Sequence, residues 1–250
     1  MYENEASIVL DKKYECPVCD AKIKSKAVKA NSAKFIDTKV DLRPVHSNVN
    51  VTKYDAICCP NCGFAALNKN FTNTTPTQRK LIREKIQANY TPHEETESEV
   101  YTTEIAISRM KMVLLCTVTK GGKSGEIGNV CLKISWLYQD LIDELDENDP
   151  NYDKKRDIYQ KEADNAAKKA YEYLSNARMT EDFPIAGMNE TTLDYLLAYY
   201  AYINEEFAVA MKYLSGVLTS RSATQRLKDK SLELKTLVSA KLHDNEESTE

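Results

Sequence analysis

Apolar residues recur at helical spacing through most of the chain after residue 75. Thr75-Pro76-Thr77 is a helix-start signal, and the helical period then runs from Leu81 to Ile86. Six further segments show the same period: residues 97–119, 126–146, 153–179, 190–203, 205–219 and 222–242. Gly, Pro and Asn mark most of the breaks between these segments. The pattern therefore predicts a series of helices joined by loops.

The first part of the chain lacks this period. Residues 27–36 and 49–58 mix β-branched and polar residues, whereas Pro44 and Asn48 interrupt the stretch between them. These two stretches predict short strands. Residues 1–15 show no strong periodicity, and residues 243–250 form an acidic tail without apolar residues, which predicts disorder.

Together these patterns predict a mainly α fold in three parts. A small β module, residues 10–75, comes first. Antiparallel helix pairs of tetratricopeptide-like type follow at residues 76–242, and the tail ends the chain. With 250 residues, 42% hydrophobic and 29% charged, the chain is long enough for one sizeable domain and a small satellite. Only seven Gly and seven Pro argue against a many-turned all-β fold.

The chain carries no recognisable targeting or membrane segment. The N-terminus, MYENEASIVLDKK, has acidic residues where a signal peptide needs positive charge. The apolar runs all fall short of the roughly 20 residues that span a bilayer. We therefore expect a cytoplasmic protein with no membrane partner.

Four of the seven cysteines form two pairs, Cys16-Pro-Val-Cys19 and Cys59-Pro-Asn-Cys62. In a reducing compartment such pairs indicate metal binding rather than disulfides. Two intervening residues allow both sulfurs of a pair to reach one ion at about 2.3 Å. The sequence predicts one structural zinc ion per chain, bound by Cys16, Cys19, Cys59 and Cys62.

The residue after each pair supports this prediction. A metal-binding turn of this type often needs a positive φ at that position. Gly63 adopts a positive φ without strain, and Asp20 belongs to the few other residue types that tolerate it. Both pairs therefore meet the backbone requirement.

Other chemistries use similar cysteines. A rubredoxin-type iron centre has the same pairs, but Lys22 and Lys24 stand where an aromatic residue usually follows the first pair. A redox dithiol needs only one pair. Cys58 is expected to point away from the metal, because neighbouring side chains of a strand face opposite sides. His46 is the one plausible substitute ligand.

The sequence predicts no catalytic residue. Four thiolates close the zinc coordination and leave no position for activating water. The loop Lys120–Gly125 resembles a phosphate-binding loop, but Thr117 stands where a Walker A motif has its first glycine. The motifs GxSxG, HExxH and GxGxxG do not occur. We therefore expect a protein that is not an enzyme.

Residues 191–219 have the layout of one tetratricopeptide repeat, a helix pair with small residues at the crossing. The usual closing proline is replaced by Ser222. A degenerate relative around Trp136 and Leu174 has too long a loop for a regular repeat. A plain helical core accounts for the same spacing, so that alternative stays open.

Two function classes follow from these parts. The helix pairs predict an interaction or scaffold module that binds a protein or peptide. Alternatively, the front of the chain binds nucleic acid, since residues 10–90 carry a charge of about +8 and the remainder about −12. The lysines for that role are Lys22, Lys24, Lys26, Lys29 and Lys34. The run lacks arginine and is almost free of aromatics until Phe35, which predicts weak, salt-sensitive binding. An iron or thiol redox protein is a remote third class.

Four segments of the chain resemble the bacterial family known as domain of unknown function 2225. They are Cys16-Pro-Val-Cys19, Asp41-Leu-Arg-Pro44, Tyr54-Asp-Ala-Ile-Cys-Cys-Pro-Asn-Cys-Gly-Phe-Ala65 and Leu132-Lys-Ile-Ser-Trp-Leu-Tyr138. Asp20 departs from the glycine expected after the first pair. The resemblance covers most of residues 12–219 and implies a cytosolic bacterial protein with a zinc-ribbon-like front and a helical-repeat back. It implies no activity.

Overall fold

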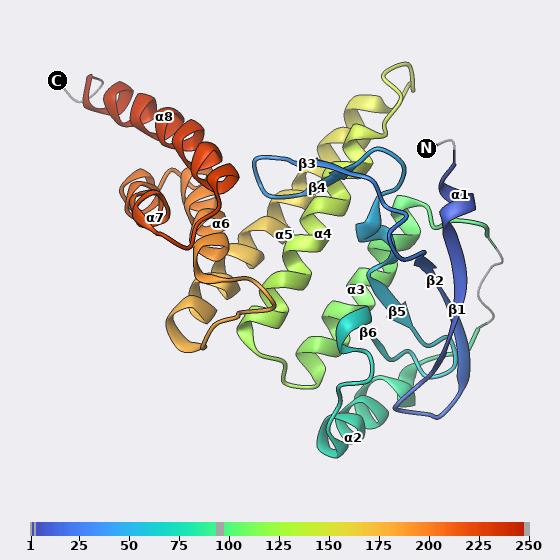
Figure 1. Cartoon of the computed structure of the whole chain (residues 1–250). Helices are drawn as coiled ribbons and strands as arrows, with labels where there is room; N and C mark the ends of the chain where they lie inside the picture. Colours follow the sequence, from blue (N-terminus) through green and yellow to red (C-terminus); the bar gives the residue numbers. More distant parts are fainter. Residues whose placement is uncertain (1, 3, 94–97, 248–250) are drawn as a thin grey trace. The chain divides into compact units, whose positions relative to one another are not determined.

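The structure is a computed structural model that describes residues 2, 4–93 and 98–247, with side chains as far as Leu242 (Figure 1). The helices are α1 (Glu5–Ile8), α2 (Pro76–Lys85), α3 (Thr103–Thr119), α4 (Ser124–Asp143), α5 (Tyr152–Thr180), α6 (Glu190–Ile203), α7 (Phe207–Thr219) and α8 (Gln225–Glu247). The strands are β1 (Val9–Glu15), β2 (Lys22–Val28), β3 (Phe35–Thr38), β4 (Pro44–His46), β5 (Ala56–Cys58) and β6 (Ala65–Leu67). Short 3-10 helices are η1 (Val51–Tyr54), η2 (Asn68–Asn70) and η3 (Gln87–Asn89). The predicted fold class, mainly α with a small β module, is confirmed.

The strands pair in twos: β1 with β2, β3 with β4, and β5 with β6. The β1–β2 pair is antiparallel, with Val9 opposite Val28 and Glu15 opposite Lys22. The sequence did not predict β1, because its exposed residues 10–13 lack an apolar alternation. Pairing with β2, rather than burial of one face, gives this segment its strand conformation.

The two predicted strands match the structure only in part. Residues 27–36 contain the end of β2 and the beginning of β3, with a turn between them. Residues 49–58 form η1 and then β5. Asn50 favours the 3-10 turn because its side-chain oxygen accepts a hydrogen bond from the backbone N–H of Thr52, 3.1 Å away. This side-chain contact competes with strand pairing and is invisible to a periodicity argument.

The helices begin where capping residues stand. Thr75 and Gln78 form a reciprocal capping box at the start of α2, and Pro76 occupies its first turn. Thr102 and Asn189 cap α3 and α6 through their side-chain oxygens. The final helix, α8, continues to Glu247, whereas the sequence predicted a helix end at Leu242 and a disordered tail. Residues 248–250 of that predicted tail lie outside the described residues.

Contacts divide the chain into two units. The metal unit comprises the chain up to Asp37, Pro44–Lys123 and Val130–Ala166. The helical unit comprises Thr38–Arg43, Ser124–Asn129 and the chain from Ala167 onward. This division differs from the predicted boundary at residue 75, and the cores explain why.

In the metal unit, the β module shares its core with the helices that follow it. Val18, Ile57 and Phe64 belong to the same buried cluster as Met110 of α3 and Leu137 of α4. All five side chains are at most 1% exposed. The module predicted for residues 10–75 therefore depends on α3 and α4 to bury its apolar surface.

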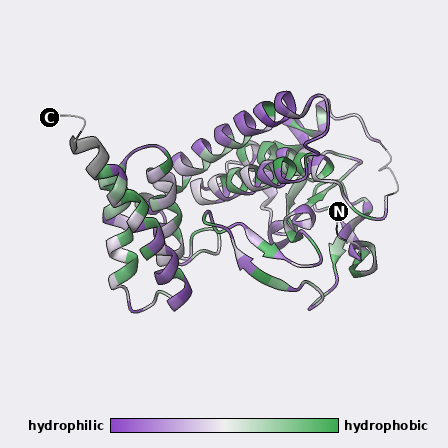
Figure 2. Cartoon of the chain, turned by 90° about the horizontal axis from the view of Figure 1, so that it is seen from above, coloured by the Kyte–Doolittle hydropathy of each residue, from purple (hydrophilic) through white to green (hydrophobic). Residues whose placement is uncertain are grey.

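In the helical unit, α6 packs against α7, and α7 packs against α8. Their common core contains Ala198 and Ala201 of α6, Ala210 and Leu214 of α7, and Leu234 of α8. The small alanine side chains allow close helix crossing. In Figure 2, hydrophobic and hydrophilic residues both occur along each of these helices, as expected for helices with one buried side.

Candidate metal centre

The first cysteine pair lies in the turn that joins β1 to β2. The backbone N–H of Cys16 donates to the carbonyl oxygen of Ala21, at 3.0 Å, and the N–H of Asp20 donates to that of Cys16, at 2.9 Å. Asp20 has a φ of +60°, the left-handed conformation predicted for this position. The turn brings both sulfurs of the pair to the same side.

The second pair, between β5 and β6, repeats this geometry. The N–H of Cys59 donates to the carbonyl oxygen of Phe64, at 2.8 Å, and the N–H of Gly63 donates to that of Cys59, at 2.9 Å. Gly63 has a φ of +74°. A Cβ atom built on Gly63 would lie 2.5 Å from the ring of Tyr90, so the position requires glycine for two independent reasons.

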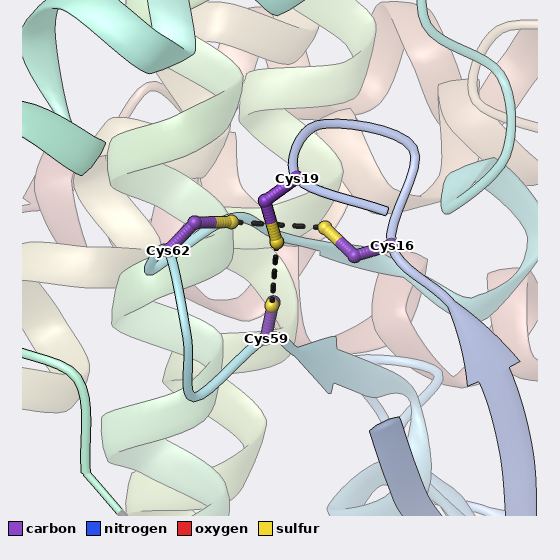
Figure 3. Close-up of side chains that lie close together, drawn as sticks. All are labelled: Cys16, Cys19, Cys59 and Cys62. Atoms are coloured by element: carbon purple, nitrogen blue, oxygen red, sulfur yellow. Dashed lines mark hydrogen bonds between the residues drawn. The ribbon is translucent and has the colours of Figure 1, made fainter. Parts of the chain in front are cut away.

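The two turns bring the four predicted ligands together, as Figure 3 shows. The sulfurs of Cys16 and Cys62 lie 3.6 Å apart, as do those of Cys19 and Cys59. All four sulfurs lie within 4.8 Å of one another. A tetrahedral ion with metal–sulfur bonds of about 2.3 Å places its sulfurs about 3.8 Å apart. The four cysteines therefore fit one tetrahedral metal ion.

The group of four is largely closed to solvent. Cys16, Cys59 and Cys62 are 0% exposed, and Cys19 is partly exposed. A four-thiolate centre of this kind offers four protein ligands and no site for substrate or water. A metal ion bound by these four cysteines would have the closed coordination of a structural centre.

In the metal-free group, interactions between the thiols determine which of them loses its proton first. Contacts with the thiols of Cys16 and Cys62 lower the pKa of Cys59 to about 2. The interaction with the thiol of Cys59 raises the pKa of Cys16 to about 12, and interactions with the thiols of Cys16 and Cys59 raise the pKa of Cys62 above its usual range. A bound cation stabilises all four thiolates at once. Metal binding must therefore expel protons that the metal-free group retains.

Two polar side chains support the first turn. The guanidinium of Arg83, on α2, donates to the carbonyl oxygen of Val18 within the turn, with Nε at 2.8 Å. The amide Nδ2 of Asn61, in the second turn, donates to the sulfur of Cys19 at 3.4 Å. Such outer contacts orient ligands and reduce the charge density on a thiolate. Neither contact is predictable from the sequence, because the elements that carry these residues meet only in the folded chain.

Cys116, on α3, contacts the second cysteine turn. Its sulfur accepts a hydrogen bond from the N–H of Ala65, at 3.2 Å, and its thiol donates to the carbonyl oxygen of Gly63, at 3.5 Å. Burial raises the pKa of Cys116 to about 11. Cys116 therefore remains a thiol and ties α3 to the second turn without being a ligand.

Among the described residues, the group of possible ligands does not include the other candidates. The thiol of Cys58 faces the carbonyl oxygen of Arg109 on α3, at 3.7 Å, so it points away from the group as predicted. His46 instead packs edge-on against Phe35 at a centroid distance of 5.6 Å. The proposal of His46 as a substitute ligand is not supported.

The lysines of the nucleic-acid alternative lie in β2 and in the loop that follows it: Lys22, Lys24, Lys26, Lys29 and Lys34. Acidic residues of β1 offset part of their charge. Lys26 forms an ion pair with Asp11 at 3.0 Å, and Lys22 lies opposite Glu15 in the strand register. The exposed strand surface is therefore less basic than the lysine count indicates.

The glycine-rich loop Lys120–Gly125 connects α3 to α4, as predicted from the failed Walker A match. The backbone N–H of Gly125, at the start of α4, donates to a carboxylate oxygen of Glu181 at 2.8 Å. A carboxylate thus takes the place that a phosphate has in a nucleotide-binding loop.

A group of four cysteines that could hold a metal ion, placed in a small β module that is followed by helices, defines the class of protein. Within this class, the chain belongs to the family described as uncharacterized protein conserved in bacteria (DUF2225), whose model matches residues 9–238. Comparisons with curated proteins and with solved structures gave no match. Among the described residues, no helix combines the length and the apolar composition needed to cross a membrane.

Proposed function

We propose that the chain is a non-enzymatic interaction protein of the cytoplasm. One zinc ion per chain holds its β module, and helices of tetratricopeptide-like type bind a polypeptide partner. The family, the fold and the four-cysteine group support the class of protein, and the zinc and the partner are inferences from chemistry.

Zinc is favoured because the four thiolates form a closed, tetrahedral set. Protein purified from its native cells should contain about one zinc atom per chain by elemental analysis. Iron at that stoichiometry, with the red colour of a four-thiolate iron centre, would instead support the redox alternative.

The partner proposal rests on one observation: α6 and α8 already hold a polypeptide segment from a distant part of the sequence. The hydroxyl of Tyr195 on α6 donates to the carbonyl oxygen of Val40, at 2.8 Å. The ammonium of Lys230 on α8 donates to the carbonyl oxygen of Thr38, also at 2.8 Å. A helical surface that binds main-chain carbonyls has the chemistry for peptide recognition.

Two exposed leucines of α8 allow a matched test. Leu237 follows Lys230 by seven residues and lies on the same side of the helix, whereas Leu232 lies roughly opposite. The two leucines are 50% and 52% exposed. We expect Leu237→Asp to weaken capture of the cytosolic partner at least tenfold, and Leu232→Asp to leave it unchanged, in quantitative affinity capture with the full chain. Equal behaviour of the two variants would remove this surface from the proposal.

The exposed Lys22 and Lys24 of β2 favour nucleic acid as the alternative partner. In that case the full chain should bind RNA or DNA near physiological salt. Raising the salt from 50 to 200 mM should then weaken binding to about five phosphates by roughly a hundredfold or more. Changing both lysines to alanine should then abolish binding. A polypeptide partner held by α6–α8 should show only a small salt effect.

A further inference from the structure

The segment that α6 and α8 hold is the tip of the β3–β4 hairpin, residues 38–43, called the tip below. It forms a tight turn in which the N–H of Lys39 donates to the carbonyl oxygen of Arg43, at 2.8 Å. The N–H of Leu42 donates to that of Lys39, at 3.0 Å, and Leu42 has a φ of +61°. Asp41 closes the turn by accepting a hydrogen bond from the N–H of Arg43, at 3.0 Å. The tip therefore has a defined conformation while it is bound to the helices.

The helices bind this turn by features that another polypeptide can supply. Tyr195 and Lys230 contact carbonyl oxygens, which every peptide carries. Leu42 is the side chain that the helices recognise, because it packs against the apolar core of α6–α8. A turn with one leucine therefore satisfies the main contacts seen here.

The bound tip also carries a desolvation cost. Asp41 and Arg43 are only 9% and 8% exposed. Removing charged side chains from water costs free energy, which offsets much of the attraction that they gain in the folded chain. A segment with leucine at the same position and without buried charges would bind this surface more favourably.

The hairpin that presents the tip is short. Strand β3 has four residues and β4 has three, and a pair of such length is marginally stable by itself. Phe35 and Ile36 in β3 are 52% and 58% exposed, so little burial anchors this strand. The tip can leave the helices without disrupting a large core.

We propose that the tip is a resident ligand of the α6–α8 surface, and that the polypeptide partner displaces it by presenting a turn with leucine in the place of Leu42. This inference rests on the proposed function, because it names the regulation of the same surface. Only chains whose tip has left the helices can bind the partner. The apparent association constant for the partner is therefore the intrinsic one multiplied by the fraction of chains with a released tip.

A fluorescent peptide of the chain's own residues 34–47 is the probe for this proposal. The variant Leu42→Ser should release the tip in the full-length protein, and the labelled peptide should bind it at least tenfold more tightly than it binds the wild type. Ile36→Ser is the matched control, since this residue is exposed in β3 and outside the tip. That variant should bind the peptide as the wild type does. A peptide carrying the Leu42→Ser change should bind neither protein.

Hydrogen exchange of the wild-type chain gives a test that needs no variant. An excess of unlabelled peptide should increase exchange at the amides of Lys39 and Leu42, which are hydrogen-bonded within the bound tip. The amides of α6–α8 should stay protected. Unchanged exchange at saturating peptide, or equal peptide affinity of wild type and Leu42→Ser, would overturn the proposal.

The two proposals fail in different ways. If the peptide binds the released variant and Leu237→Asp does not affect capture of a cytosolic partner, the resident ligand stands and the proposed function does not. If a partner binds wild type and Leu42→Ser equally, and Leu237→Asp weakens it, the partner surface stands and its regulation by the tip fails.

Discussion

The metal unit and the helical unit keep their cores together by different means. In the β module of the metal unit, strands as short as three residues meet around four cysteines that come from two segments 40 residues apart. In the helical unit, α6, α7 and α8 follow one another with short connections and bury one another's apolar sides. The first arrangement depends on the cysteine group that joins two distant segments. The second depends on helical periodicity and on packing between consecutive helices.

This difference predicts unequal responses to loss of the metal. A zinc ion bound by four cysteines contributes on the order of 10–16 kcal/mol to folding of a small module. None of the four ligands belongs to the helical unit. Removing the ion should therefore lower the free energy of unfolding of the metal unit and leave that of the helical unit unchanged.

The largest effect is expected for Cys59→Ser. The variant should bind no zinc and lose hydrogen-exchange protection across the metal unit, including α3, because Cys116 and Met110 share its core with the module. Helices α6–α8 should keep their protection. Exchange mass spectrometry and elemental analysis of the purified variant measure both results.

Cys58→Ser is the matched control for this change, because Cys58 is the neighbouring cysteine and faces Arg109 instead of the metal. It should retain one zinc per chain and near wild-type protection. Loss of protection throughout α6–α8 in Cys59→Ser would show that the two units fold as one. It would contradict the expectation that the helical unit is stable without the metal.

A smaller effect is expected for Gly63→Ala. A left-handed φ costs an alanine about 1–2 kcal/mol, and the contact with Tyr90 at 2.5 Å adds a steric cost of about 1–3 kcal/mol. Gly121→Ala is the control, because Gly121 has a φ of +67° with no other atom within 4 Å of the added Cβ among the described residues. The Gly121→Ala variant should lose only the stability that a left-handed φ costs an alanine. Chemical denaturation of the zinc-loaded variants measures the difference, and equal losses would mean that Tyr90 yields freely.

These elements also show which features the sequence could predict. The cysteine spacing and the φ requirement at Asp20 and Gly63 are local, so the ligand set followed from them. The helices α6 and α7 likewise follow from local periodicity. The roles of Arg83 and Cys116 depend on which segments meet in space, and nothing in their sequence neighbourhoods encodes that meeting.

One buried cluster includes residues on both sides of the predicted boundary at residue 75, for the same physical reason. The periodicity correctly marked where helices begin, but it carries no information about which elements share a core. Phe64 and Met110 belong to one buried cluster although one lies in the β module and the other in a helix. The contact between the tip and α6 was unpredictable for the same reason, since Val40 and Tyr195 are separated by 155 positions.

Zinc retention by the metal unit should fall as the pH is lowered. The pKa values of Cys16 and Cys62 are raised by interactions with other thiols of the group, so their thiols hold protons at pH 7 unless a cation is bound. Metal binding then releases at least two protons, and the apparent affinity should fall by roughly a hundredfold or more, at least about 2.7 kcal/mol, for each pH unit removed. Competition with a chromogenic chelator between pH 6 and 8 measures this slope. The exchange protection of α6–α8 should not follow it, and an affinity independent of pH would contradict the protonation scheme.

The smallest effect is expected for Asn61→Ala, which removes the hydrogen bond to the sulfur of Cys19 while leaving four thiolates in place. Loss of an outer contact of this kind lowers metal affinity about 10- to 100-fold, and the exposed position of Asn61 points to the lower end, about 1.4 kcal/mol. Competition with the same chelator should show this decrease with one zinc still bound at saturation. Asn70→Ala serves as the control, because Asn70 lies in η2, outside both cysteine turns. An effect of Asn61→Ala as large as that of Cys59→Ser would mean that Asn61 holds the second turn together, so that its contribution would be folding of the module rather than adjustment of one sulfur.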